Sequence, residues 1–82
     1  MSKLIGELVR PHIDQDSKLS AFIWRKRPYE VVEILSHWWE PSEWWNGKAM
    51  RFFVRVKARK SSEGIYELYR LEDNWFLYKV LD

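Results

Sequence analysis

Apolar and basic side chains alternate along residues 50–59, and this alternation constrains the fold more than any other feature of the sequence. One parity carries the apolar residues Met50, Phe52, Val54, Val56 and Ala58. The other parity carries Arg51, Phe53, Arg55, Lys57 and Arg59. A period of two residues predicts a β-strand with one buried face and one face in solvent.

Two further strands are predicted after this one, at residues 65–71 and 75–81. Lys60–Gly64 is interpreted as the first turn because it ends in a glycine, which can adopt positive φ. Glu72–Asn74 is interpreted as the second turn, since its last residue, Asn74, tolerates the left-handed region.

The register of these strands follows if both hairpins close symmetrically. Arg55 is then expected opposite Tyr69, and Glu67 opposite Lys79. The interior face would hold Val54, Val56, Ala58, Tyr66, Leu68, Phe76, Tyr78 and Val80. A slip of one residue would turn the basic row into the core, so the faces are more strongly specified than the exact partners.

The first half of the chain carries a weaker pattern. Residues 21–24 and 29–38 predict a hairpin around the turn Arg25–Pro28, and the poor alternation of the second strand indicates a bend. Leu4–Arg10 fits either a strand or one helical turn that ends at Pro11. His12–Ser20 is interpreted as a polar connector. Residues 1–20 are therefore either part of the domain or a loosely attached segment.

Taken together, these elements predict one all-β domain over residues 1–82. We expect five to six antiparallel strands in a meander that curls into a partly open barrel. A chain of 82 residues buries a small core. Its 14 aromatic residues offset that shortage, because each ring buries a large apolar area.

The sequence offers little for catalysis. It has no cysteine, and Gly6, Gly47 and Gly64 are isolated, so neither a thiolate site nor a glycine-rich phosphate loop is present. We therefore expect a non-enzymatic protein without a cofactor or a metal. The lack of cysteine fits a reducing cytoplasm, and no stretch resembles a signal peptide or a membrane span.

The basic residues are concentrated in one segment. Residues 48–60 contain six Lys or Arg and no acid, although the whole chain carries a net charge of only +2. Basic and aromatic side chains on one strand face are typical of proteins that hold single-stranded nucleic acid. The candidate binding residues are Arg51, Phe53, Arg55, Lys57 and Arg59, extended by Arg25, Lys26 and Arg27. The competing interpretation is an ordinary solvent-facing strand, on which Lys and Arg resist aggregation.

The stretch WWEPSEWW, residues 38–45, holds four of the six tryptophans. Neighbouring residues of a strand point to opposite faces, so one member of each pair is expected in the core. The other member is left for a partner, because tryptophan is favoured at interface hot spots. Trp39 and Trp44 are the candidate partner-binding residues, and this is the alternative function: protein interaction or self-association.

The blocks WWNGKAMRFFVRV and GIYELYRLEDNWFLYKVLD resemble the C-terminal segment of ImuB-like proteins, inactive Y-family polymerase relatives of bacterial mutagenic repair. The same blocks are similar to a family of short stand-alone bacterial proteins of unknown function. The matching positions are Trp44, Trp45, Gly47, Tyr66, Leu68, Tyr69, Arg70, Trp75, Phe76, Leu77 and Asp82. The resemblance covers no catalytic palm, so it implies an accessory module rather than a polymerase.

The expected partner is therefore single-stranded nucleic acid or a repair-associated protein, and not a membrane. A domain with no nucleic-acid role stays open as a further alternative. The sequence leaves the oligomeric state open.

Overall fold

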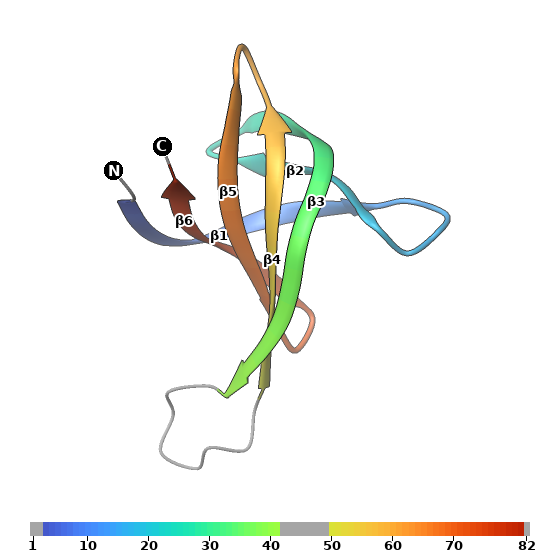
Figure 1. Ribbon diagram of the computed structural model, residues 1–82, viewed down its shortest axis with the longest axis vertical. Helices are drawn as coiled ribbons and strands as arrows, with labels where there is room; N and C mark the ends of the chain where they lie inside the picture. The colour runs from blue at the N-terminus through green and yellow to red at the C-terminus, as the bar shows by residue number, and fades with distance from the viewer. Residues whose placement is uncertain (1–2, 42–49, 82) are drawn as a thin grey trace.

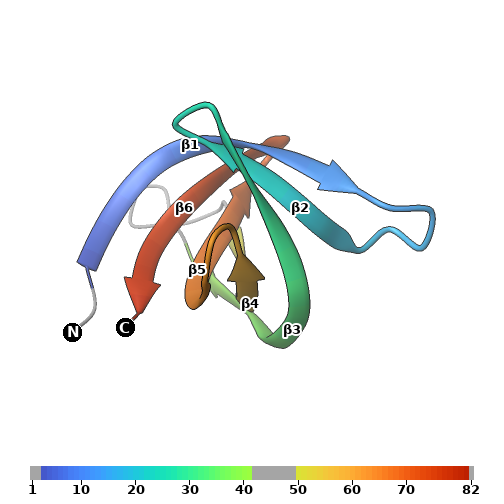
Figure 2. The same cartoon turned by 90° about the horizontal axis from the view of Figure 1, so that it is seen from above.

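The computed structural model describes residues 3–41 and 50–81, and all of the regular structure in these ranges is β-strand. The strands are β1 (Lys3–Ile13), β2 (Leu19–Trp24), β3 (Arg27–Pro41), β4 (Met50–Arg59), β5 (Glu63–Leu71) and β6 (Asn74–Leu81). Each strand pairs antiparallel with the next, and β1 pairs with β6 to complete an uneven ring (Figures 1 and 2). The predicted all-β meander is confirmed. No helix, and so none able to cross a membrane, occurs in the described ranges.

The first strand, β1, completes the ring. Residues 3–9 pair with β6, while residues 10–13 pair with β2. Gly6 has a φ of 70° where the register with β6 shifts, so β1 bends there at a β-bulge. The alternative of a helical turn ending at Pro11 is wrong, because Pro11 lies inside the strand opposite Phe22. The pairing of β1 with β6 ends at Val9. Pro11, which has no backbone N–H, therefore interrupts no pairing with β6.

The segment predicted as a polar connector, residues 12–20, is shorter than expected. His12 and Ile13 still belong to β1, and Leu19 and Ser20 already belong to β2. The next turn is also tighter than predicted. Arg25 and Lys26 alone form it, with φ values of 54° and 65°. Two residues with positive φ match the right-handed twist of the flanking strands.

The poor alternation of β3 has a structural cause. Two β-bulges, at Val32 and Leu35, each insert one extra residue against β4. Val31, Ile34 and His37 consequently line the inside of the ring at a spacing of three residues. The predicted bend is thus confirmed, and the inserted residues are exposed.

The opposite edge of β3 is paired over only part of its length. Its pairing with β2 ends at Ala21 and Glu30, and residues 31–41 pair with β4 alone. The ring is therefore closed between β2 and β3 only near their shared turn, and the two strands leave an opening beyond Ala21 and Glu30. Among the described residues, nothing pairs with the backbone along this edge.

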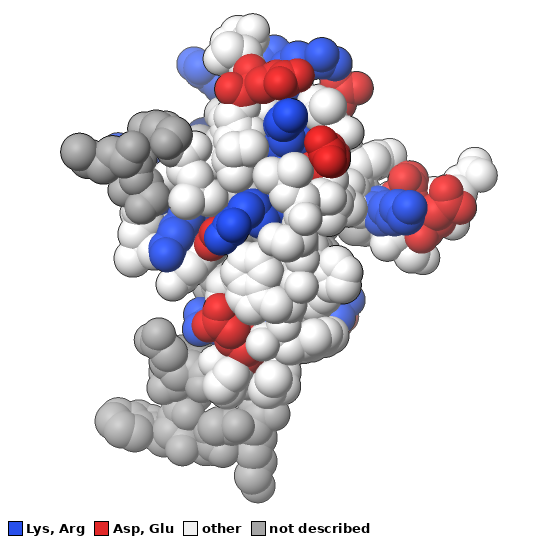
Figure 3. Space-filling view, in the orientation of Figure 1, with Lys and Arg blue, Asp and Glu red and all other residues white. Residues whose placement is uncertain are grey.

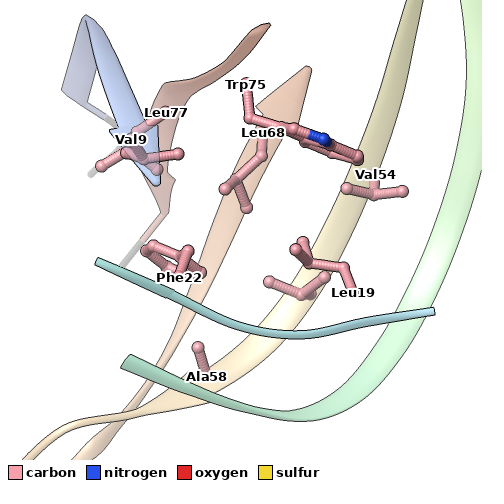
Figure 4. Packing of buried hydrophobic residues seen from close by; sticks show 9 residues of the cluster. Val9, Leu19, Phe22, Val54, Ala58, Leu68, Trp75 and Leu77 are labelled. Carbon is pink, nitrogen blue, oxygen red and sulfur yellow. The ribbon is translucent and has the colours of Figure 1, made fainter. Parts of the chain in front are cut away.

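The core lies inside the ring and draws on five strands. Figure 4 shows these side chains converging from the surrounding strands, with the Trp75 indole reaching toward Val54. Five further core residues were not in the predicted interior set: Val9, Leu19, Phe22, Trp75 and Leu77. The last two replace Phe76 and Tyr78, which were predicted inside and lie outside.

The register of β4 and β5 also differs from the prediction. Arg55 lies opposite Glu67 rather than Tyr69, a shift of two residues that keeps each face as predicted. The shift arises because the turn already closes between Arg59 and Glu63, so that Gly64 belongs to β5 and has no positive φ.

The β5–β6 pairing was predicted correctly at only one end. Glu67 lies opposite Lys79 as expected, but Tyr78 is an extra residue in β6, and beyond it the partners change. Tyr69 therefore faces Phe76. The turn is also one residue shorter than predicted: Glu72, with a φ of 57°, takes the left-handed conformation expected of Asn74.

Candidate nucleic-acid interface

A row of large apolar side chains crosses the outside of the ring. The pairings place these residues side by side on five successive strands, in the order Trp38, Phe53, Tyr69, Phe76 and Leu8. We call these five residues the outer row. At a spacing of ~4.8 Å between strands, the row is roughly 19 Å long.

The rings of the outer row contact one another. Trp38 stacks on Phe53 with centroids 5.4 Å apart, and Tyr69 stacks on Phe76 at 5.0 Å. Phe53 and Tyr69 join the two stacks at 5.3 Å. Tyr78 packs edge-on against Phe53 from the bulge in β6. The four aromatic rings of the row are therefore in continuous contact.

Phe53 was predicted as an exposed ring for stacking, and this is wrong. Only 1% of its surface is exposed, because Trp38, Tyr69 and Tyr78 cover it. Phe53 thus forms the centre of a second small core outside the ring. The rings that cover it are partly exposed and are the ones that a ligand could reach.

Three cations lie over these rings. The Arg51 guanidinium is 5.1 Å from the Phe53 centroid and 5.2 Å from that of Tyr69. Arg55 lies 5.6 Å from the Trp38 ring, and Lys79 lies 5.2 Å from the Tyr78 ring. Such contacts position a positive charge beside an aromatic face, where phosphate and base would both find partners.

The cations differ in how far they are neutralised. Arg55 donates from Nε and one terminal nitrogen to Glu67 Oε2, at 2.9 and 2.7 Å. Arg59 forms an ion pair with Glu30 at 2.7 Å. The hydrogen bond to Glu30 raises the pKa of Arg59 above its ordinary value. Arg51, Lys57 and Lys79 form no ion pair with the described residues.

The turn that was predicted to extend the basic surface meets the other end of the outer row. Arg25 and Lys26 line the same hollow as Leu8 and Asp73. Arg25 also forms an ion pair with Glu7 at 2.7 Å, and Arg27 begins β3. The predicted basic residues are thus distributed over two ends of one surface rather than along a single strand.

Glu7 joins three elements of this region. Its carboxylate accepts hydrogen bonds from the Trp24 indole at 2.9 Å and from Arg25 at 3.1 and 2.7 Å. The bonds from Arg25, and after them that from Trp24, lower the pKa of Glu7 from 4.5 to about 2. Glu7 therefore clamps β1 to the end of β2.

Charge on this side of the molecule is mixed. Figure 3 shows blue and red atoms in close alternation around a white area, in the orientation in which β3, β4 and β5 face the viewer. On this face the described residues do not form the uniformly basic surface that the sequence suggested. The surface is better described as an aromatic row bordered by cations.

Trp38 and Trp39 of the stretch at residues 38–45 point to opposite faces as expected, but neither lies in the core, so that part of the prediction is wrong. Trp38 lies outside and donates from its indole to Glu40 at 2.7 Å, while Trp39 lies on the opposite face against Phe52. Trp39 is 54% exposed, so it does not close the core. Trp44 lies outside the described residues.

Sequence reasoning missed the outer row because its members come from five strands. Tyr69, Phe76 and Leu8 lie on three different strands, and only the correct register between those strands shows that they are neighbours. The sequence did contain one sign of this row: β6 has aromatic residues at both odd and even positions, namely Trp75, Phe76 and Tyr78. This pattern requires rings on both faces of a strand.

The described residues form a small six-stranded antiparallel ring that carries the outer row, bordered by cations, on its outside. In the described residues, no group of three His, Cys, Asp or Glu side chains could hold a metal ion. The chain belongs to the family named as a domain of unknown function, DUF6504, whose model matches residues 1–82. No curated protein and no solved structure matches it.

Proposed function

We propose that this protein is a non-catalytic module that binds single-stranded nucleic acid along the outer row. The observation that carries the proposal is the aromatic surface with Arg51, Arg55 and Lys79 placed over its rings. Bases stack on exposed aromatic faces whatever their sequence, and the cations meet the phosphates. Binding without sequence preference is therefore expected.

The resemblance to the C-terminal segment of ImuB-like proteins supports a role beside DNA-repair machinery. It carries no weight for chemistry, since the resemblance includes no catalytic residues. A repair-associated protein is therefore the partner that we propose alongside the nucleic acid.

Fluorescence anisotropy with labelled oligothymidylate tests the proposal. The double variant Arg51→Met/Lys79→Met removes two cations that form no described ion pair, so it should flatten the slope of log K against log salt by about 1–1.5. Trp38→Leu should weaken binding by ~1–3 kcal/mol through lost stacking. Lys60→Met, in the β4–β5 turn, is the control for the general loss of charge.

Absence of binding at low salt would reject the proposal, as would a double variant that binds with an unchanged slope. Arg55 is unsuitable for this experiment, because removing it also leaves the buried Glu67 without its ion-pair partner.

A second candidate function is protein interaction or self-association through Trp39. Its indole is more than half exposed, and it lies on the part of β3 whose other edge is unpaired. Val32 and Leu35 add exposed apolar side chains along the same strand. Such a strand can accept another strand, although its two bulges act against regular pairing.

A further inference from the structure

A groove lies inside the opening between β2 and β3, on the opposite side of the sheet from the outer row. Its volume is about 1010 Å³. Most of the lining is aliphatic or aromatic, including Leu19, Ile34, Trp39, Phe52, Val54 and Trp75. Grooves of this size and composition are suited to small ligands with an apolar body.

Two cations line the groove: Lys18, in the β1–β2 turn beside Asp14, and Arg70 on β5. The pairings align Trp39, Phe52, Arg70 and Trp75 on four successive strands, and all four line the groove. The Arg70 guanidinium lies 5.9 Å from the Phe52 ring. Arg70 lies on the inner face of the sheet between two aromatic neighbours and is exposed, so a ligand in the groove can reach it.

No carboxylate of the described residues forms an ion pair with Arg70. Asp14 borders the groove, but its Oδ1 already accepts hydrogen bonds from the amides of Asp16 and Lys18 at 2.9 and 3.0 Å. Glu33 also borders it, but lies opposite Lys57 on the outward side of the β3–β4 pair. The Arg70 guanidinium is therefore available to a negatively charged ligand.

We propose that the groove binds a monocarboxylate with an apolar body. A carboxylate matches a single guanidinium by two parallel hydrogen bonds, and one negative charge balances one cation. The neighbours of Arg70 in its row, Phe52 and Trp75, are apolar and offer no second cation to a phosphate dianion. The apolar part of the ligand would lie against Trp39, Phe52 and Trp75. This site is separate from the outer row and does not rest on nucleic-acid binding.

Chemical-shift titration of the ¹⁵N-labelled protein with octanoate, compared with 1-octanol, tests the proposal at concentrations below micelle formation. The two probes share a chain length and differ in charge. Octanoate should bind about tenfold more tightly, as a charge-assisted pair with one guanidinium predicts. The shifts should concentrate on groove residues such as Val54 and Trp75, and not on the outer row.

Arg70→Met should reduce octanoate binding to the level of 1-octanol and leave the binding of 1-octanol unchanged. Arg10→Met, an exposed β1 arginine outside the groove, should leave both affinities unchanged. Because the comparison of probes is made on the wild type as well, it holds even if Arg70→Met does not fold.

Equal affinities for the two probes in the wild type would overturn the proposal. That result would describe a general apolar surface, of the kind a second copy of the chain could cover. Shifts confined to the outer row, or no shifts with either probe, would overturn it as well.

Discussion

Arg55 and Glu67 form an ion pair across β4 and β5 in which the Glu67 side chain is 6% exposed and the Arg55 side chain is 44% exposed. The pair lies in the row next to Phe53 and Tyr69, so it seals one side of the outer aromatic cluster. Its partners were separated in the predicted register. The correct pairing shows that this arginine has a structural role that the basic strand alone did not suggest.

Arg55→Met should destabilise the protein by ~1–3 kcal/mol, because it leaves the buried Glu67 without its ion-pair partner. The double variant Arg55→Met/Glu67→Met should recover most of the loss. Urea unfolding at neutral pH measures both. Lys57→Met on the same strand face is the control and should change stability by less than ~0.5 kcal/mol. An equal loss of stability in Arg55→Met and Lys57→Met would contradict a structural role of Arg55.

Phe53→Ala should destabilise the protein by ~3–5 kcal/mol, as expected for an aromatic ring in a packed core. A solvent-facing strand residue would cost far less. Thermal or urea unfolding provides the measurement, with Val32→Ala as the exposed control, expected within ~0.5 kcal/mol of the wild type. A small effect at Phe53 would mean that the outer cluster does not pack in solution.

The Glu7 clamp predicts a dependence of stability on pH. Its pKa is lowered from 4.5 to about 2 in the folded state, so the carboxylate stabilises the fold fully above pH 4.5. This contribution is lost as the pH falls from 4.5 toward 2, because protonation removes the acceptor of Arg25 and Trp24. The stability difference between wild type and Glu7→Gln should therefore shrink across that window.

Unfolding measured at several pH values tests the Glu7 prediction. Glu72→Gln serves as the control, since its carboxylate forms no described ion pair. A difference between wild type and Glu7→Gln that stays constant from neutral pH to pH 2 would count against the clamp.

Trp39→Ser should convert any dimer to monomer if the β3 edge mediates self-association. Sedimentation velocity over a range of protein concentrations, at low and high salt, measures this. Little dependence on salt is expected, because the contact would be apolar. A wild type that sediments as a monomer at every concentration would remove self-association, and Trp39 would then remain a candidate only for a different protein.

The sequence predicted strand type and strand faces well where the period of two is regular, as in β4. It failed where an extra residue changes the phase. Val32, Leu35 and Tyr78 are each inserted against a partner strand, and nothing in their own side chains marks them as insertions. Each one moves the residues that follow it to the other face.

The candidate site was predicted in part for the same reason. The cations over the rings, Arg51 and Arg55, were identified from the basic strand. Phe53 was identified on the correct face, but its burial depends on Tyr69, Tyr78 and Trp38, which come from other strands. Arg70, the groove cation on the sheet, could not be recognised because its neighbours Phe52 and Trp75 are set by register alone.

The pairing of Lys3 with Val80 places the two ends of the described chain side by side on neighbouring strands. A short linker between them would join β6 to β1 without disturbing any pairing, and new ends could then be opened at the β2–β3 turn. Such a circular permutant should keep the ring, the outer row and the groove. For the same geometric reason, any segment fused at either end would leave the ring from one common point, which makes the module easy to place within a larger assembly.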